Sequence, residues 1–247
     1  IRGNLLTAER IQALRAIHEQ DEVTVITTFD ALMNTMAPAK QLWDSICRIV
    51  PEDTIDLEQM KDLLVCMGYE KEYQVESMGQ FAIRGGILDV YPLTEENPVR
   101  IELWGDEIDS IRSFSAESQR SLENLETVKI YPAAEIIFEE AVLEKGLKKI
   151  EADAKKLSEL YQKEMKTEEA HRVRLLASTA KESIEQFGSV EGMDAYLTYF
   201  EEETVSLLDY FSKEDALVFL DEPVRAIEKG RVIEKEFQES MKQRLEK

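Results

Sequence analysis

The chain has 247 residues, of which 51 are acidic and 30 basic, so its formal net charge is −21. A chain this acidic repels nucleic acid at long range, and no run of lysines and arginines offsets the charge locally. Hydrophobic residues make up 43% of the sequence, an ordinary share for a globular protein, and no stretch of about eighteen apolar residues predicts a membrane span. The first residue is Ile1 and no targeting pattern follows it, so we expect a segment of a longer cytoplasmic protein.

The cysteine and histidine content argues against a disulfide or a zinc site. Cys47 and Cys66 each lie among apolar neighbours, which favours buried thiols in a reducing cytosol. The two histidines, His18 and His171, complete no zinc site of standard spacing. We therefore expect no metal and no cofactor.

The first 44 residues predict a helix, a strand and a second helix. Apolar residues recur at helical spacing over 7–19, where Thr7 can cap the helix. The β-branched run 23–27 predicts a buried strand, and a short helix at 29–33 should end before the next proline. Helix, strand and helix form a fragment of an α/β unit that is too small to bury a core by itself.

Residues 45–133 predict a separate unit, a helix packed on a curled antiparallel sheet. Asp56 is a candidate N-cap for a helix over 57–67, and Gly68 stands where a left-handed C-terminal cap is wanted. Segments of alternating polar and apolar residues, separated by turn residues, follow this helix. They predict strands at 80–84, 87–91, 99–104, 107–114 and 127–131.

Residues 134–247 predict a mostly helical region. A charged stretch over 136–187 carries one apolar stripe, which indicates helices with a solvated outer face. The apolar run 216–220 predicts a second buried strand, and the tail from Ala226 predicts another helix. We expect this region and the first 44 residues to pack together as an α/β domain, into which the α+β unit is inserted.

The predicted strand 216–220 ends in Asp221 and Glu222, as a Walker B strand does when it holds Mg²⁺ for nucleotide hydrolysis. Hydrolysis also needs a phosphate-binding loop in which glycine and lysine precede serine or threonine, and none of the ten glycines is followed by lysine. Without that loop, an acidic cap on a strand end is the simpler interpretation. The sequence also lacks a Gly-x-Ser-x-Gly nucleophile elbow, and no spacing singles out a catalytic pair among its 51 acids. We therefore propose no catalytic residue.

The strands at 80–84 and 99–104 predict a basic and aromatic cluster on one face of the sheet. Residues two apart in a strand share a face, so Arg100 and Trp104 point the same way, and Arg84 points away from the apolar residues of its own strand. If the apolar face packs on the helix, all three side chains project outward. A tryptophan on a solvated sheet face is uncommon, and arginine and tryptophan dominate interface hot spots. The cluster therefore predicts a docking surface for another protein.

A plainer interpretation of the same three residues stays open. Trp104 could fold against a neighbouring loop, and Arg84 and Arg100 could pair with the abundant acids. Alternation along the strands does not decide between this arrangement and a docking surface.

At these residues the chain resembles the bacterial transcription-repair coupling factors, the Mfd family, and more loosely the excision-repair protein UvrB. The resemblance extends to S-L-L-D-Y-F at 206–211 and to the acidic pair after 217–220, and it is weak over 134–205. It is most specific over 80–132, in the segments F-A-I-R-G-G-I-L-D-V-Y-P, V-R-I-E-L-W-G-D-E-I-D-S-I-R-S-F, S-Q-R-S-L and V-K-I-Y-P-A.

The resemblance implies a UvrB-like amino-terminal module. In such a module a degenerate helicase-like domain is split between the two ends of the chain, and an inserted domain binds UvrA. The family contacts UvrA through two arginines and an aromatic residue, and Arg84, Arg100 and Trp104 stand at the same spacings of sixteen and four. Trp104 departs from the phenylalanine that the family can carry there. Asp221 and Glu222 would be remnants of a Walker B strand, and the parent protein would be an ATP-dependent DNA translocase that meets RNA polymerase and DNA through its other parts.

We therefore expect a non-catalytic docking module that binds UvrA and couples stalled transcription to nucleotide excision repair. One alternative is an ATP- or nucleic-acid-binding helicase fragment, which rests on the α/β ends and on Asp221 and Glu222. Another is that 45–133 is only a spacer and that the acidic helices form the contact surface.

Overall fold

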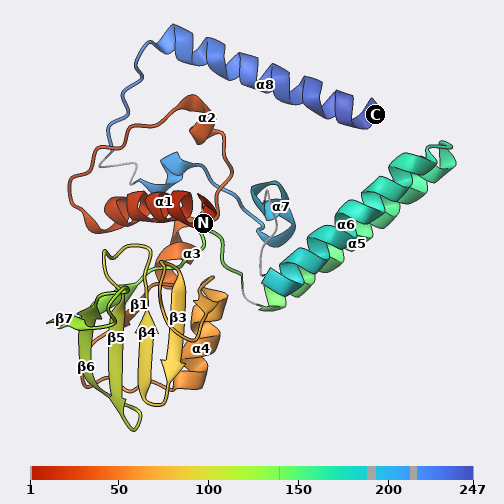
Figure 1. Ribbon diagram of the computed structural model, residues 1–247. Helices are drawn as coiled ribbons and strands as arrows, with labels where there is room; N and C mark the ends of the chain where they lie inside the picture. Colours follow the sequence, from red (N-terminus) through yellow and green to blue (C-terminus); the bar gives the residue numbers. More distant parts are fainter. Residues whose placement is uncertain (1, 139, 188–192, 212–215, 247) are drawn as a thin grey trace. The chain divides into compact units, whose positions relative to one another are not determined.

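The protein folds into two compact units. The first comprises residues 1–23 and 39–139, and the second comprises residues 24–38 and 140–247. The strands gather in the first unit and are mostly antiparallel, while the second unit is helical, so the fold is of the mixed α+β kind. The computed structural model, drawn as ribbons in Figure 1, describes residues 2–138, 140–187, 193–211 and 216–246.

The first unit is built on a six-stranded sheet with the strand order β2-β3-β4-β5-β6-β7. β2 runs parallel to β3 and the other neighbouring pairs are antiparallel. A second sheet pairs β1 (Cys47–Ile49) with β8 (Val128–Ile130). The bounds of the six strands are β2 Glu70–Lys71, β3 Gln80–Arg84, β4 Ile87–Val90, β5 Val99–Trp104, β6 Glu107–Phe114 and β7 Ser121–Asn124. The five predicted strands are therefore confirmed, although the last of them belongs to the two-stranded sheet.

Helix α4 (Leu57–Cys66) is the helix predicted between Asp56 and Gly68. The Asp56 side chain accepts hydrogen bonds from the backbone N–H groups of Glu58 and Gln59, which satisfies donors that the first helical turn leaves free. Gly68 follows the helix with a φ of 87°, and a Cβ there would lie 2.9 Å from the Cβ of Ala134. Glycine is therefore required at this position both by the backbone angle and by the close packing.

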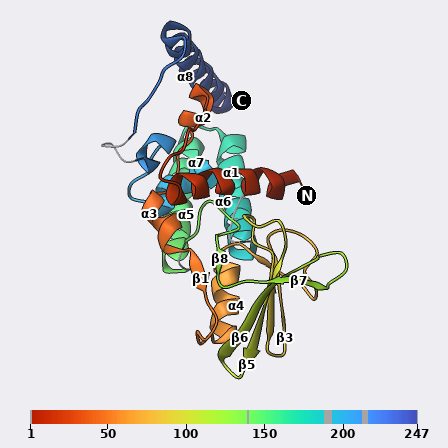
Figure 2. The same ribbon diagram turned by 90° about the vertical axis from the view of Figure 1, so that its left-hand side faces the viewer.

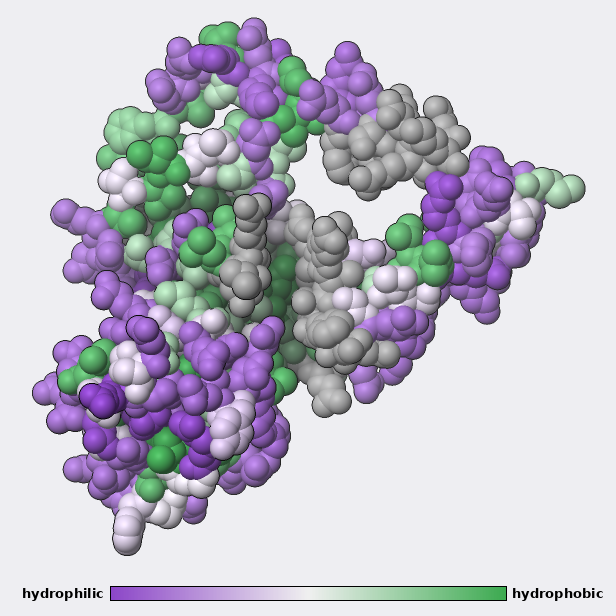
Figure 3. Space-filling view, in the orientation of Figure 1, coloured by the Kyte–Doolittle hydropathy of each residue, from purple (hydrophilic) through white to green (hydrophobic). Residues whose placement is uncertain are grey.

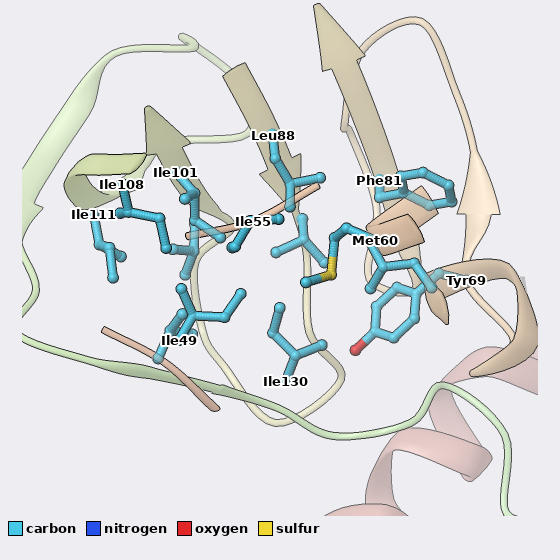
Figure 4. Packing of buried hydrophobic residues seen from close by; sticks show 14 of the residues in the cluster. Ile49, Ile55, Met60, Tyr69, Phe81, Leu88, Ile101, Ile108, Ile111 and Ile130 are labelled. Atoms are coloured by element: carbon cyan, nitrogen blue, oxygen red, sulfur yellow. The ribbon is translucent and has the colours of Figure 1, made fainter. Parts of the chain in front are cut away.

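The core of the first unit lies between the six-stranded sheet on one side and α4 with the two-stranded sheet on the other (Figures 2 and 4). Leu64 of α4 is completely buried, as are Leu88 and Ile101 at the centre of the sheet. Each side chain of this size contributes about 1.5–3 kcal/mol when it is fully removed from water. The apolar side chains that the alternation predicts to face inward therefore form the core that stabilises this unit.

Helix α1 (Arg2–Glu19) belongs to the same unit and is tied to it by ion pairs. Arg10 donates two hydrogen bonds to Glu135, with N···O distances of 2.6 and 2.7 Å. Arg15 donates to the backbone carbonyl of Thr94 at 2.9 Å. The predicted helix at 7–19 is thus confirmed, with its start five residues earlier.

The second unit contains a long helical hairpin of α5 (Glu140–Lys163) and α6 (Thr167–Phe187). Lys181 of α6 pairs with Glu151 of α5 at 2.6 Å. The predicted helical stretch at 136–187 is therefore confirmed as two helices joined by a short turn. The remaining elements are α2 Phe29–Leu32, α7 Met193–Phe200, the 3₁₀ helix η1 Leu207–Tyr210 and α8 Pro223–Glu246, while α3 Ala39–Asp44 belongs to the first unit.

Two glycines of the second unit mark close contacts with aromatic rings. A Cβ on Gly146 of α5 would lie 2.1 Å from the Phe200 ring of α7, and a Cβ on Gly230 of α8 would lie 2.5 Å from the Phe29 ring of α2. Both distances are shorter than real Cβ contacts, so a side chain at either position would require the ring to move.

The two buried strands predicted at 23–27 and 216–220 are wrong. Neither segment forms a strand, and among the described residues neither pairs with one. The side chain of Ile26 is 93% exposed and that of Phe219 is 87% exposed. A β-branched or apolar run favours a strand only where a neighbouring strand supplies hydrogen bonds and a packing surface, and the described part of the chain offers neither segment such a neighbour.

Candidate protein-docking face

The outer face of the six-stranded sheet, opposite α4, is lined with charged side chains. The strand register places Ala82, Asp89, Arg100 and Arg112 side by side across β3, β4, β5 and β6. The next row contains Arg84, Ile87, Glu102 and Ser110. Figure 3 views the sheet from this side, where its surface is mostly hydrophilic. We call these two rows, together with Trp104, the docking face.

Arg84 and Arg100 meet at one carboxylate, that of Asp89. Arg100 donates from Nε to Oδ1 at 2.7 Å and from Nη2 to Oδ2 at 2.8 Å, and Arg84 donates from Nη2 to the same Oδ2 at 2.5 Å. The hydrogen bond with Asp89 raises the pKa of Arg100 above its already high value. The two arginines thus share a face, as the alternation predicts, and they form one cationic group around a common anion.

The exposure of the two guanidinium groups differs. The Arg84 side chain is 34% exposed and that of Arg100 is 16% exposed. The Arg100 guanidinium carbon lies 4.6 Å from the centre of the Phe114 ring, within the range of a cation–π contact. Arg100 is therefore the more firmly held of the two, and Arg84 is the more accessible.

Trp104 ends β5 and is 85% exposed, so it does not fold against a neighbouring loop. The tight turn after it uses Gly105 with a φ of 67°. A shallow hollow of about 340 Å³ lies beside the indole and is lined by Gly86, Ile87, Glu102, Leu103 and Asp109. An exposed ring beside a hollow that contains two carboxylates is suited to a partner with both apolar and polar groups.

Arg112 is a third arginine on the docking face, which the sequence analysis missed. Its guanidinium pairs with Glu102, which also accepts a hydrogen bond from Ser110 Oγ at 3.1 Å. A β-bulge after Glu102 shifts the pairing of β5 with β6 by one residue and brings Arg112 opposite Arg100. The sequence carries a sign of this bulge, because Ile108 and Ile111 are three apart, whereas residues on one face of a regular strand are an even number apart.

The plainer interpretation of the cluster is therefore half correct. Arg84 and Arg100 do pair with an acid, Asp89, whereas the tryptophan remains exposed. Because an arginine offers five N–H donors, pairing with one carboxylate leaves donors for a second. An internal ion pair and a docking role are thus compatible.

Asp221 and Glu222 belong to the second unit and follow a segment, 216–220, that has no regular secondary structure. Both are exposed, and Glu222 pairs with Arg225 at 2.9 Å in the first turn of α8. Within the described residues, no group of three or more histidine, cysteine, aspartate or glutamate side chains is placed to hold a metal ion. None of the described helices has both the length and the apolar character needed to cross a membrane.

Comparison with known proteins shows which proteins this chain is similar to. Residues 47–136 match the model of the UvrB interaction domain, and the docking face lies within them. The chain is 35% identical to the transcription-repair-coupling factor of Bacillus subtilis and 32% identical to that of Staphylococcus haemolyticus, in each case over 98% of this chain and 20% of the relative. It is 33% identical to the UvrABC system protein B of Thermosipho africanus, over 86% of this chain and 33% of the relative.

The chain therefore spans between a fifth and a third of the length of these relatives. The match to the family model coincides with the core and sheet of the first unit, while the relatives align with both units. Residues 47–136 thus match the UvrB interaction domain, and the chain is similar over most of its length to transcription-repair-coupling factors and to UvrABC system protein B.

Proposed function

We propose that the docking face binds the excision-repair protein UvrA, and that the chain is a non-catalytic module that couples stalled transcription to nucleotide excision repair. The observation that carries the proposal is that Arg84 and Arg100 meet at Asp89 on a sheet face whose strand β5 ends in the exposed Trp104, within the residues that match the UvrB interaction domain. In this proposal the module acts in the cytoplasm without a cofactor. The parent protein supplies ATP-driven DNA translocation and meets RNA polymerase and DNA through other parts.

The chemistry of the face fits a protein partner. A planar guanidinium binds carboxylates through two parallel hydrogen bonds, and an exposed indole gains free energy when a pocket covers it. Electrostatic steering would come from the local positive charge of the two arginines, which stands out on a chain of net charge −21. The same net charge disfavours a role in binding nucleic acid.

The proposal extends to the second unit, which we interpret as part of a degenerate helicase-like domain. The relationship to UvrABC system protein B over 86% of the chain supports this interpretation. No phosphate-binding loop accompanies Asp221 and Glu222, so a nucleotide titration should detect no ATP binding by this chain.

Affinity for purified UvrA tests the proposal. Arg84→Ala, Arg100→Ala and Trp104→Ala should each weaken binding about tenfold or more, since each removes a hot-spot side chain. Tyr73→Ala is a matched control, because Tyr73 belongs to the same unit and is also 85% exposed. It should change the affinity by less than about twofold.

A second control addresses the idea that the helices form the contact surface. Leu175 and Leu176 are 56% and 59% exposed on α6, so replacing both with alanine should leave UvrA binding unchanged. If the α6 variant loses binding and the docking-face variants retain it with intact folds, the proposal is rejected.

A further inference from the structure

A carboxylate with no solvent exposure lies within the docking face. Asp89 sits in the middle of β4 and is 0% exposed, while its neighbours across the sheet are Ala82 and Arg100. A buried charge is costly unless it is paired and hydrogen-bonded. Asp89 meets that condition by accepting three hydrogen bonds, all from Arg84 and Arg100.

The pairing fixes where the two guanidinium groups lie. Arg100 uses Nε and Nη2 in a two-pronged contact, and Phe114 covers its guanidinium face at 4.6 Å. Arg84 is held through one nitrogen, Nη2. An unpaired arginine on a surface samples many rotamers and loses that freedom on binding, whereas a fixed one has already lost it.

The cluster of Arg84, Arg100 and Asp89 can still bind a partner after this pairing. Two guanidinium cations and one carboxylate leave a net charge of +1. Of the five N–H donors on each arginine, the bonds to Asp89 use two from Arg100 and one from Arg84. The remaining donors suit a second carboxylate, which would be presented by the partner.

The neighbouring ion pair on the same face differs from the Asp89 cluster in the solvent exposure of its carboxylate. Glu102 and Arg112 are 30% and 31% exposed, so water can replace either partner. Asp89 has no such access, and loss of its charge would leave Arg84 and Arg100 repelling each other without a counter-ion. Burial thus distinguishes Asp89 from the other acids of the docking face.

We propose that Asp89 is a positioning residue that holds Arg84 and Arg100 as one preformed fork for a carboxylate of the partner. This inference rests on the proposed function, in which the partner is UvrA. Asp89 itself, being buried, does not touch the partner. Its effect on binding is therefore transmitted entirely through the two arginines.

A double-mutant cycle tests whether Asp89 affects binding only through Arg84 and Arg100. Asp89→Asn keeps the size of the side chain and removes its charge, and it should weaken UvrA binding about tenfold. In the Arg84→Ala/Arg100→Ala background the same change should alter the affinity by less than about twofold, because the groups through which Asp89 acts are absent. Asp62→Asn, on the exposed surface of α4, is the control for loss of one aspartate charge.

The outcomes separate this inference from the proposed function. If Arg84→Ala/Arg100→Ala binds UvrA as the wild type does, the proposed function fails and the inference fails with it. If that variant binds weakly but Asp89→Asn binds as the wild type or more tightly, only the inference is overturned. An Asp89→Asn effect that persists in the double-variant background shows a general structural role and also overturns it.

Two further measurements keep the inference testable if Asp89→Asn does not fold. Arg100→Lys retains the charge but not the two-pronged geometry, so it should lose as much affinity as Arg100→Ala. Wild-type binding by Arg100→Lys would contradict a requirement for a positioned fork. In the wild-type protein, the Arg100 Nε–H should exchange with solvent at least about tenfold more slowly than that of the exposed Arg48, and equal rates would overturn the inference.

Discussion

The strands of the first unit and the two apolar segments at 23–27 and 216–220 have similar compositions but different structures. Ile101 in β5 is 0% exposed, whereas Ile26 is 93% exposed. The difference lies in their neighbours, because β5 has β4 on one side and β6 on the other, while the apolar segments pair with no strand among the described residues. Apolar and β-branched residues thus favour a strand, but pairing and a covering layer determine whether it forms.

Rates of amide hydrogen exchange should show the largest difference between the strands of the first unit and the two apolar segments. Backbone amides at the centre of the sheet, such as those of Leu88 and Ile101, should exchange at least about a thousandfold more slowly than those of 23–27 and 216–220. Exchange of core amides requires opening close to global unfolding, which costs about 5–15 kcal/mol, and about 1.4 kcal/mol corresponds to a tenfold change in rate. Strong protection of 216–220 in the isolated chain would show that this segment pairs as a strand after all.

The next largest difference should be in the free energy of unfolding, when one isoleucine is replaced in the sheet and one in the segment 23–27. Ile101→Ala removes a completely buried side chain and should lower the free energy of unfolding by about 2–5 kcal/mol. Ile26→Ala, at 93% exposure, should change it by no more than about 0.5 kcal/mol. Chemical denaturation of both variants measures the difference. Equal losses would mean that the segment around Ile26 is packed in solution.

The ion pairs that tie α1 to the sheet unit should give a smaller, pH-dependent effect. Burial opposes ionisation of Glu19, but hydrogen bonds from Lys129 and Arg15 outweigh it and lower the pKa of Glu19 from 4.5 to about 2. Ionised Glu19 therefore stabilises the fold above pH 4.5, and this stabilisation is lost as the pH falls toward about 2.

Unfolding of the wild type and of Glu19→Gln at several pH values tests this expectation. The wild type should be the more stable at neutral pH, and the difference should shrink as the pH falls from 4.5 to about 2. In the Lys129→Ala background the difference should be smaller, because one of the hydrogen-bond donors to Glu19 is absent. A difference that stays constant down to pH 2 would contradict the lowered pKa.

Much of the first unit could be predicted from the sequence because its signals are local. Asp56 and Gly68 bracket α4 through contacts within a few residues, and glycines mark the turns after Arg84 and Trp104. The short strands β2 and β7 were missed, since Glu70–Lys71 and Ser121–Asn124 are polar and exposed. Such edge strands form because a neighbour is available, and their own composition gives no sign of it.

The candidate site could be predicted in part. Alternation placed Arg84 and Arg100 on one face, because the side-chain period of a strand is fixed. The role of Asp89 was missed, because the sequence I-L-D-V gives no sign that arginines from two neighbouring strands would meet its carboxylate. Arg112 was missed because the bulge after Glu102 moves it onto the docking face. The contacts of Asp89 depend on pairing between strands, which single-strand patterns do not contain, whereas the bulge left a sign in the spacing of Ile108 and Ile111.

Binding of purified UvrA to the wild-type chain and to Arg84→Ala/Arg100→Ala tests the central claim most directly. We predict a loss of about a hundredfold or more in affinity for the double variant, with an unchanged circular dichroism spectrum and with the Tyr73→Ala control binding as the wild type does. Undiminished binding by a folded double variant would contradict the claim that the outer face of the sheet is the docking surface.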